Sequence, residues 1–172
     1  HIFYQPRHEW DAYAVSAQEY KPLTLLSETG SVEHLDNFSD SKEIDSFIDT
    51  HAPDLSVRGG DTEVISWLSI RENKELLAIA ALCRWQSGAV VISSVGVHSA
   101  HRNKGLGKLI TAATTEFGLA QSGTVALGVL GSNAPAKRVY ESLGYTLLGE
   151  FASFSRRQGI QIQLEQSACC DH

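Results

Sequence analysis

The chain has 172 residues, of which 42% are hydrophobic, and a formal net charge of −6, so it can bury a sizeable core within one domain. Its longest apolar run, Leu76–Cys83, is far shorter than the roughly eighteen residues of a membrane span, which excludes a transmembrane helix of ordinary length. The acidic side chains gather in residues 1–94, and this balance disfavours nucleic acid as a partner, because binding nucleic acid requires positive charge opposite phosphates.

The N-terminal part of the chain is predicted to contain two helices and a short strand. Residues 9–20 carry apolar side chains at helical spacing, namely Trp10, Tyr13, Ala14 and Ala17. A short strand is expected over Leu23–Leu26, before a second helix that Ser39 or Asp40 would cap. The apolar stripe of that second helix consists of Ile44, Phe47 and Ile48.

Three strands in succession are predicted after the loop at Gly59–Gly60. Val64–Arg71 and Leu76–Gln86 flank a short polar connection, Glu72–Lys74, which suits an antiparallel hairpin. The third strand of the set is Ala89–Val97.

Helices and strands then alternate towards the C-terminus. A helix is expected from Leu106 to about Gln121, followed by a strand over Val125–Leu130. Asn133, a proline in the first turn and Gly144 predict the start and the end of one further short helix. The remaining strands are Tyr145–Ser155 and Ile160–Leu164. This order predicts a mixed α/β fold with helices on both faces of the sheet.

The most informative segment is Val95–Leu109, in which an apolar strand runs into a basic turn and then a helix. A helix N-terminus leaves its first backbone N–H groups without partners and carries partial positive charge. Gly105 and Gly107 lack the Cβ atoms that would keep a diphosphate away from those groups. Positive side chains surround the turn, namely Arg102, Lys104 and Lys108. The segment therefore predicts a site for a phosphorylated cofactor.

Two common phosphate-binding motifs do not match this turn. A nucleotide-binding P-loop needs Gly where Arg102 stands and Ser or Thr where Leu109 stands. A dinucleotide-binding turn needs a third glycine where Ile110 stands. The sequence therefore disfavours binding of ATP, GTP or NAD by these routes.

The turn instead resembles the acetyl-CoA loop of the GNAT superfamily of N-acetyltransferases, in which Arg/Gln-x-x-Gly-x-Gly/Ala follows a strand. A second match is the run Asn-x-x-Ala-x-x-x-Tyr-x-x-Leu-Gly-Tyr over Asn133–Tyr145. The resemblance covers residues 60–155 and implies a central, mixed, mostly antiparallel sheet flanked by helices on both faces. One departure is Ser99, which stands where many members have Pro.

The resemblance also implies acetyl-CoA as cosubstrate, without a metal, and a single N-acetyltransferase domain over residues 1–172. Within it, residues 1–60 would form much of the acceptor side, 95–145 the acetyl-CoA-binding core and 166–172 a tail. The residues expected to contact the coenzyme are Val97, Arg102, Asn103, Lys104, Gly105, Leu106, Gly107, Lys108, Asn133, Lys137 and Tyr140.

The mechanism that the resemblance implies is direct transfer of acetyl to an amine in a ternary complex. The backbone amide of Val97 would stabilise charge on the thioester oxygen, and Gly96 is compatible either with a bulge in this strand or with close packing. Tyr140 would act as the general acid for the departing thiolate. Glu63 is the nearest candidate for the general base, with His98 and His101 as weaker ones. A water relay without a single essential base is an alternative.

The resemblance implies a primary amine of a small molecule or a peptide as the acceptor. The acidic N-terminal half would attract such a cation, although its carboxylates are equally compatible with ordinary solvated helix faces. A catalytically silent CoA-binding sensor or partner module, or an acyltransferase that uses a longer acyl-CoA, are the alternatives. A homodimer stays open, since dimers are common in the superfamily. Three cysteines cannot pair evenly and no secretion signal is visible, so a reduced, cytoplasmic protein is expected.

Overall fold

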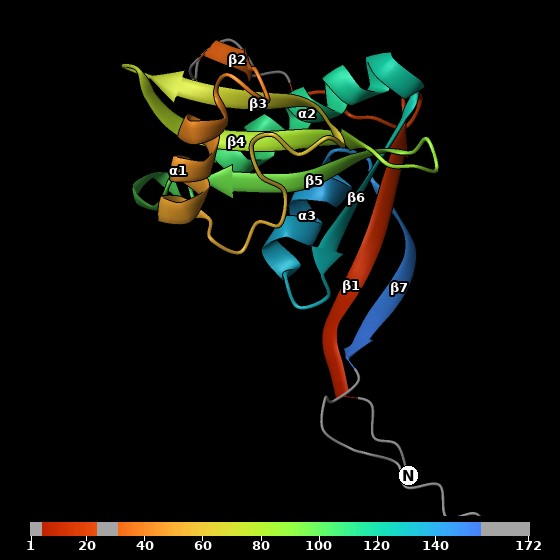
Figure 1. The fold of residues 1–172 in the computed structure, drawn as a ribbon. Helices are drawn as coiled ribbons and strands as arrows, with labels where there is room; N and C mark the ends of the chain where they lie inside the picture. The colour runs from red at the N-terminus through yellow and green to blue at the C-terminus, as the bar shows by residue number, and fades with distance from the viewer. Residues whose placement is uncertain (1–4, 24–30, 156–172) are drawn as a thin grey trace, which may run out of the picture.

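The computed structural model describes residues 5–23 and 31–155, which form one seven-stranded sheet with helices on both of its faces (Figure 1). The strands are β1 (Gln5–Ser16), β2 (Ser31–Leu35), β3 (Val64–Glu72), β4 (Glu75–Arg84), β5 (Val90–Val97), β6 (Thr124–Leu130) and β7 (Thr146–Ser155). The helices are α1 (Ser41–His51), α2 (Leu106–Ser122), α3 (Ala134–Ser142) and the short 3₁₀ helix η1 (Ser99–His101).

The strand order across the sheet is β2-β3-β4-β5-β6-β1-β7. Neighbouring strands are antiparallel except β5 and β6, which are parallel. The prediction of a mixed, mostly antiparallel sheet is therefore confirmed.

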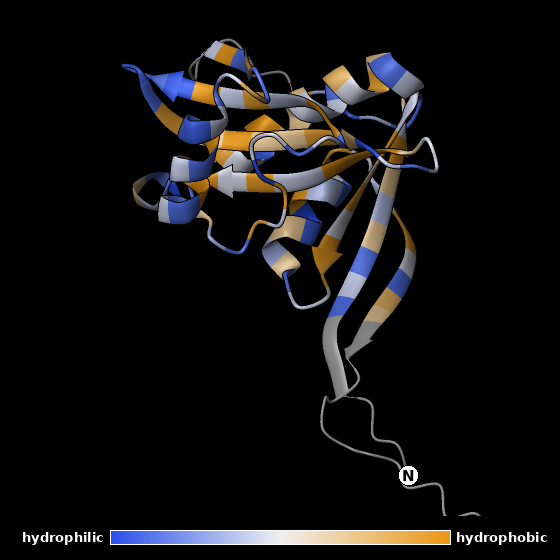
Figure 2. Ribbon diagram, in the orientation of Figure 1, coloured by the Kyte–Doolittle hydropathy of each residue, from blue (hydrophilic) through white to orange (hydrophobic). Residues whose placement is uncertain are grey.

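The core forms two layers because side chains on β3 and β4 alternate between the faces of the sheet. Trp67 on β3 packs with the buried stripe of α1, whereas its neighbour Leu68 packs with α2 on the other face. Hydrophobic residues run along β4 at the centre of the sheet (Figure 2). Leu76–Cys83, the longest apolar run of the chain, is buried throughout because helices cover both of its sides.

Several locally encoded elements form as predicted. Ile44, Phe47 and Ile48 are the buried residues of α1. The hairpin between β3 and β4 turns at Asn73 and Lys74, whose φ angles of 50° and 70° are those of the turns that suit a two-residue hairpin. The predicted strand over 160–164 and the tail 166–172 lie outside the described residues, as does most of the strand expected over 23–26.

The helix predicted over residues 9–20 is wrong, because this segment forms most of strand β1. β1 lies between β6 and β7, and pairs with both along most of its length. The buried residues alternate as Asp11, Tyr13 and Val15, which is the period of a strand. Tyr13 and Val15 reach the core shared with β6 and α2, so burial against distant segments overrides the helical spacing of Trp10 and Ala14.

A buried asparagine joins the segment before α1 to the loop before β3. The Asn37 side-chain oxygen accepts hydrogen bonds from Trp67 Nε1 at 3.0 Å and from the Gly60 amide at 3.1 Å. Its Nδ2 donates to the Asp61 carbonyl at 2.9 Å. Asn37 therefore fixes the loop that leads into Glu63.

We expect Asn37→Ala to lower the free energy of unfolding by about 2–4 kcal/mol, because it leaves the buried Trp67 Nε1 and the partly buried Gly60 amide without an acceptor. Urea denaturation measures the change. The control is Ser39→Ala, since the exposed Ser39 hydroxyl bonds only the exposed Asp36 carboxylate. We expect that control to change stability by less than about 0.5 kcal/mol. Equal losses in the two variants would contradict the structural role of Asn37.

Candidate functional site

The sheet opens between its two parallel strands. β5 and β6 pair only at Val91–Ala126 and Ile92–Leu127, although β5 continues to Val97 and β6 to Leu130. Beyond Ile92 the facing backbone edges have no strand partner within the described residues. An extended ligand can therefore pair with main-chain groups in this opening.

The bulge in β5 lies at Ser93 and not at Gly96. Ser93 is the extra residue between the pairs that Ile92 and Ser94 make with β4. Gly96 pairs regularly, and a Cβ atom on it would lie 3.2 Å from the Ala52 Cβ. Of the two roles considered for Gly96, the structure therefore supports close packing beneath the end of α1 and not a bulge.

The backbone amide of Val97 points into the opening. The His98 amide donates to the Leu77 carbonyl of β4 at 2.8 Å. Because antiparallel pairs alternate between hydrogen-bonded and non-hydrogen-bonded positions, the preceding pair, Val97 with Ala78, is a non-hydrogen-bonded one. The N–H of Val97 is therefore directed away from β4, towards the side on which β6 has diverged.

The first turn of α2 lies next to this strand end. A Cβ atom built on Gly107 would be 3.7 Å from Val97 Cγ2. Gly105 is the N-cap of α2 with φ 81°, and no side chain within the described residues caps the helix. A Cβ atom on Gly105 would meet nothing within 4 Å, and the N–H groups of the first turn of α2 have no intrahelical acceptor. Asn103 also has a left-handed backbone, with φ 61°.

The basic side chains around this turn differ in what they contact. Lys104 is exposed and Lys108 is half-buried in the first turn of α2. The Arg102 guanidinium donates to the His51 carbonyl at the end of α1, at 2.6 Å. Arg102 therefore joins the turn to α1, and its remaining donors bond no other residue in the part of the chain that the structure describes.

Three histidines gather near the same turn. The rings of His51 and His98 have centroids 3.7 Å apart, and His101 lies 5.1 Å from His98. His98 Nε2 is 3.2 Å from Glu75 Oε1. Burial, and then the nearby positive charge of His98, lowers the pKa of His51. None of these histidines lines either cavity described below, so the geometry gives no support to His98 or His101 as a base.

Tyr140 and Asn133 come from α3 and its cap. The Asn133 side-chain oxygen accepts the Ala136 amide at 3.2 Å and so caps α3, a role that leaves its amino group free to donate. The Tyr140 ring lies between Tyr13 and Tyr145, with centroid distances of 6.2 and 6.0 Å. Burial raises the pKa of Tyr140 to about 12, and no described residue hydrogen-bonds its hydroxyl. Tyr140 is therefore a protonated phenol whose hydroxyl has no hydrogen-bond partner among the described residues, although it lines neither of the cavities described below.

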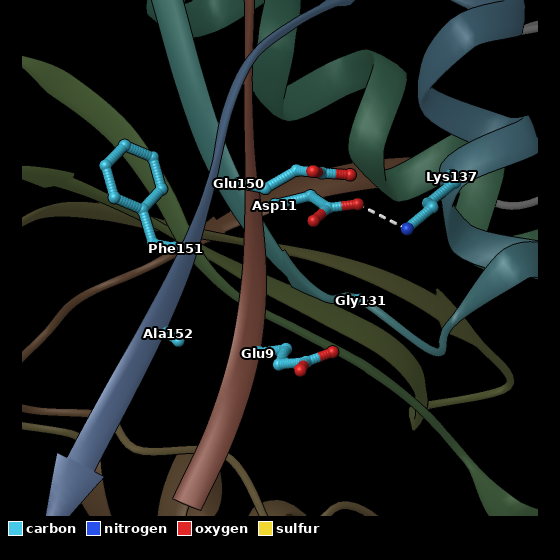
Figure 3. Close-up of a pocket in the computed structure, with 7 residues that line it drawn as sticks. All are labelled: Glu9, Asp11, Gly131, Lys137, Glu150, Phe151 and Ala152. Carbon is cyan, nitrogen blue, oxygen red and sulfur yellow. Dashed lines mark ion pairs between the residues drawn. The ribbon is translucent and has the colours of Figure 1, made fainter. Parts of the chain in front are cut away.

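A cavity of about 320 Å³ lies between β1, β7 and α3 (Figure 3). The side chains of Glu9, Asp11 and Glu150 face the side of α3, while the ring of Phe151 points away from them. Lys137 forms an ion pair with the buried Asp11, and the hydrogen bond that its ammonium donates to that carboxylate raises the pKa of Lys137. The Lys137 ammonium, which the family resemblance assigns to coenzyme binding, is therefore paired with Asp11 in this structure.

A larger cavity of about 780 Å³ lies at the opening between β5 and β6, on the α1 side of the sheet. From these two strands it is lined by Val91, Ile92, Ser93 and Gly128. Glu63 also lines this cavity, so the fold brings the predicted base candidate to the point where the strands separate.

Three aromatic residues of this cavity were missed by the sequence analysis, namely Trp10, Trp85 and Phe151. The apolar spacing assigned Trp10 to the face of a helix. No pattern in the sequence indicates that these three residues, which are far apart along the chain, line one cavity. A period-2 interpretation of residues 9–16 could have placed Trp10 on a sheet face.

Residues 5–23 and 31–155 contain neither a membrane-spanning helix nor a metal-binding cluster. No helix in these ranges is both long and apolar enough to cross a membrane. Their His, Cys, Asp and Glu side chains form no group of three or more that could hold a metal ion.

Comparison with known families gives a match over residues 27–145, more than half of the chain, to the model described as the acetyltransferase (GNAT) family. Comparison with curated proteins gives no significant match.

Solved structures of the same family share the fold. A GNAT-family protein from Novosphingobium aromaticivorans superposes with a TM-score of 0.69 at 18% identity, over 88% of this chain and 66% of that one. A GCN5-related N-acetyltransferase from Kribbella flavida gives 0.67 at 19% identity, over 91% and 61%. A GNAT-family acetyltransferase from Colwellia psychrerythraea gives 0.66 at 14%, over 89% and 57%. The chain thus spans less than two thirds of the length of these structures.

Proposed function

The chain belongs to the GNAT family of acetyltransferases, and on that premise we propose that it moves an acetyl group from acetyl-CoA to a primary amine of a small molecule or a peptide. The observation that carries this proposal is the adjacency of the uncapped first turn of α2 to the unpaired edge of β5. The first turn of α2 suits a diphosphate, and the unpaired edge of β5 suits an extended chain of amides. Coenzyme A contains both groups in one molecule.

The residues at this junction fit the coenzyme. The N–H groups of Leu106, Gly107 and Lys108 belong to the first turn of α2, which has no intrahelical acceptor for them. The charges of Lys104 and Lys108, and the free donors of Arg102, would hold the diphosphate with these amides. The unpaired edge of β5 up to Val97 would pair with the pantetheine amides.

Acetyl-CoA supplies an acyl thioester, and the residues of this chain would handle its charges and protons. The Val97 amide would donate a hydrogen bond to the thioester oxygen. As the C–N bond to the amine forms and the C–S bond breaks, Tyr140 would give its proton to the sulfur. The proton lost by the amine would pass to Glu63, directly or through water.

The coenzyme site is tested with Lys108→Glu. Calorimetric titration with coenzyme A should show binding to the parent protein and at least about tenfold weaker binding to the variant, because a charge-assisted contact becomes a repulsion. An acidic residue in the first turn favours a helix, so the loss would not come from unfolding of α2.

Lys42→Glu is the matched control, since it makes the same charge change in the first turn of α1. We expect this variant to bind coenzyme A like the parent. Equal weakening in both variants would show that net charge, and not this turn, governs binding. Absence of heat with the parent protein would overturn the proposed function.

A further inference from the structure

The wall of the larger cavity exposes three large aromatic side chains. Trp10 is 40% exposed, Trp85 51% and Phe151 61%. Large aromatic side chains are usually mostly buried. Several exposed ones on the same surface mark a site that binds a ligand or another molecule. They come from β1, from the turn after β4 and from β7, so the fold gathers them from distant parts of the chain.

The register of β1 explains why two of these rings share one face. Trp10 pairs directly with Phe151 of β7, and directly opposite residues in an antiparallel pair project from the same side of the sheet. Asp11 and Glu150 form the next pair and project from the opposite side, towards Lys137 (Figure 3). The pleat thus separates an aromatic face from an acidic one.

The charge of the larger cavity is negative. Its described lining includes two acidic residues, Glu63 and Asp11, and no Lys, Arg or His, but the Asp11 side chain projects from the opposite side of the sheet. The Asp11 carboxylate is matched by Lys137, which leaves Glu63 as the acidic group without a described ion-pair partner. One cationic group can therefore be neutralised in this cavity, whereas a second would be desolvated without a partner.

We propose that this cavity selects acceptors in which one primary ammonium is attached to an aromatic or bulky apolar body. The apolar body would pack against Trp10, Trp85 and Phe151, and the ammonium would lie on the Glu63 side, where the strands separate. The cavity volume of about 780 Å³ lies within the range of sites that bind small organic molecules. This inference rests on the proposed function, and it makes the three aromatic residues determinants of specificity.

Binding can be followed without any turnover, because the tryptophans report on the cavity. The chain has three tryptophans, and Trp67 is fully buried away from the cavity. Quenching of Trp10 and Trp85 fluorescence by 2-phenylethylamine therefore measures occupancy. We expect its dissociation constant to be at least about tenfold lower than those of glucosamine and spermidine, which are polar or carry several charges.

Two variants and a control test the assignment. Phe151→Ala should weaken binding of 2-phenylethylamine about five- to tenfold, and Trp85→Ala should do the same as read from Trp10. Leu148→Ala is the control, because Leu148 is 66% exposed on the same strand and does not line the cavity. These exposed side chains can be shortened without removing core contacts.

The outcomes separate this inference from the proposed function. If coenzyme A binds but 2-phenylethylamine binds no better than glucosamine, the inference is overturned and the proposed function stands. Equal weakening by Phe151→Ala and Leu148→Ala would also overturn it. If coenzyme A does not bind, the proposed function fails, whatever the fluorescence titration gives.

Discussion

Tyr140→Phe should lower kcat by about 10²- to 10⁴-fold, the usual contribution of a positioned general acid, and leave the affinity for coenzyme A within about threefold. The reason is that the substitution removes the hydroxyl and little else. The Tyr140 ring keeps its contacts with Tyr13 and Tyr145, while no described residue depends on the hydroxyl for a hydrogen bond. Steady-state release of coenzyme A with a saturating amine measures kcat, and calorimetry measures the affinity.

The pH dependence gives a second reading of the same residue. Burial raises the pKa of Tyr140 to about 12, so the phenol stays protonated across the neutral range and would lose its proton only in strong alkali. The rate of the parent enzyme should therefore show no alkaline decline attributable to this acid near neutral pH. A decline that is centred near neutrality and disappears in Tyr140→Phe would contradict the assignment.

Tyr145→Phe is the matched control for this substitution. The Tyr145 hydroxyl lies 2.7 Å from Thr115 Oγ1 in the core, and burial raises its pKa as well. We expect Tyr145→Phe to cost about 1 kcal/mol of stability through that hydrogen bond and to leave kcat near the parent value. An unchanged kcat in Tyr140→Phe would show that Tyr140 is not the general acid.

The parts of the fold that the sequence predicts well are those encoded locally. Gly105 and the basic residues around it identify the start of α2, because a left-handed N-cap and an open helix end are properties of a few consecutive residues. The turn at Asn73 and Lys74 is encoded in the same way. Residues 106–121 and 125–130 differ from the observed elements by a single residue at an end.

The N-terminal strand could not be predicted in this way because its partners are far along the chain. Tyr13 fits the apolar face of a helix and equally the buried side of a strand. The choice is made by pairing with β6 and β7, more than a hundred residues away, and by burial beside Val125. The aromatic wall of the cavity depends on the pairing of β1 with β7. It could therefore not be predicted from the sequence either.

The roles of polar residues at the site depend on competing partners that a motif does not contain. Lys137 lies in the matching run of the family, yet the structure pairs it with Asp11, a residue of the misassigned segment. Arg102 likewise contacts the His51 carbonyl. A motif thus identifies which residues are near a site, whereas the tertiary contacts decide which of their donors remain free.

Gly144→Ala should lower the free energy of unfolding by roughly 3–5 kcal/mol, the largest loss that we expect from any single methyl group in this chain. Gly144 has φ 93°, and a Cβ atom on it would overlap the carbonyl oxygen of Glu19. Backbone hydrogen bonds fix both sides of this contact, since the Lys21 amide donates to the Leu143 carbonyl at 3.0 Å. Neither segment can move away without losing that bond. Urea denaturation measures the loss.

Gly123→Ala separates the two causes of this loss. Gly123 ends α2 with φ 73°, but a Cβ atom there would meet nothing within 4 Å, so only the left-handed backbone is penalised, by about 1–2 kcal/mol. The additional loss of stability in Gly144→Ala, compared with Gly123→Ala, then measures the cost of the overlap with the segment after β1. Because the Tyr145 amide bonds the Tyr140 carbonyl across this glycine, the overlap should also displace Tyr140 and lower kcat in the folded fraction. Equal losses of stability, with kcat unchanged, would mean that α3 is not held by this contact.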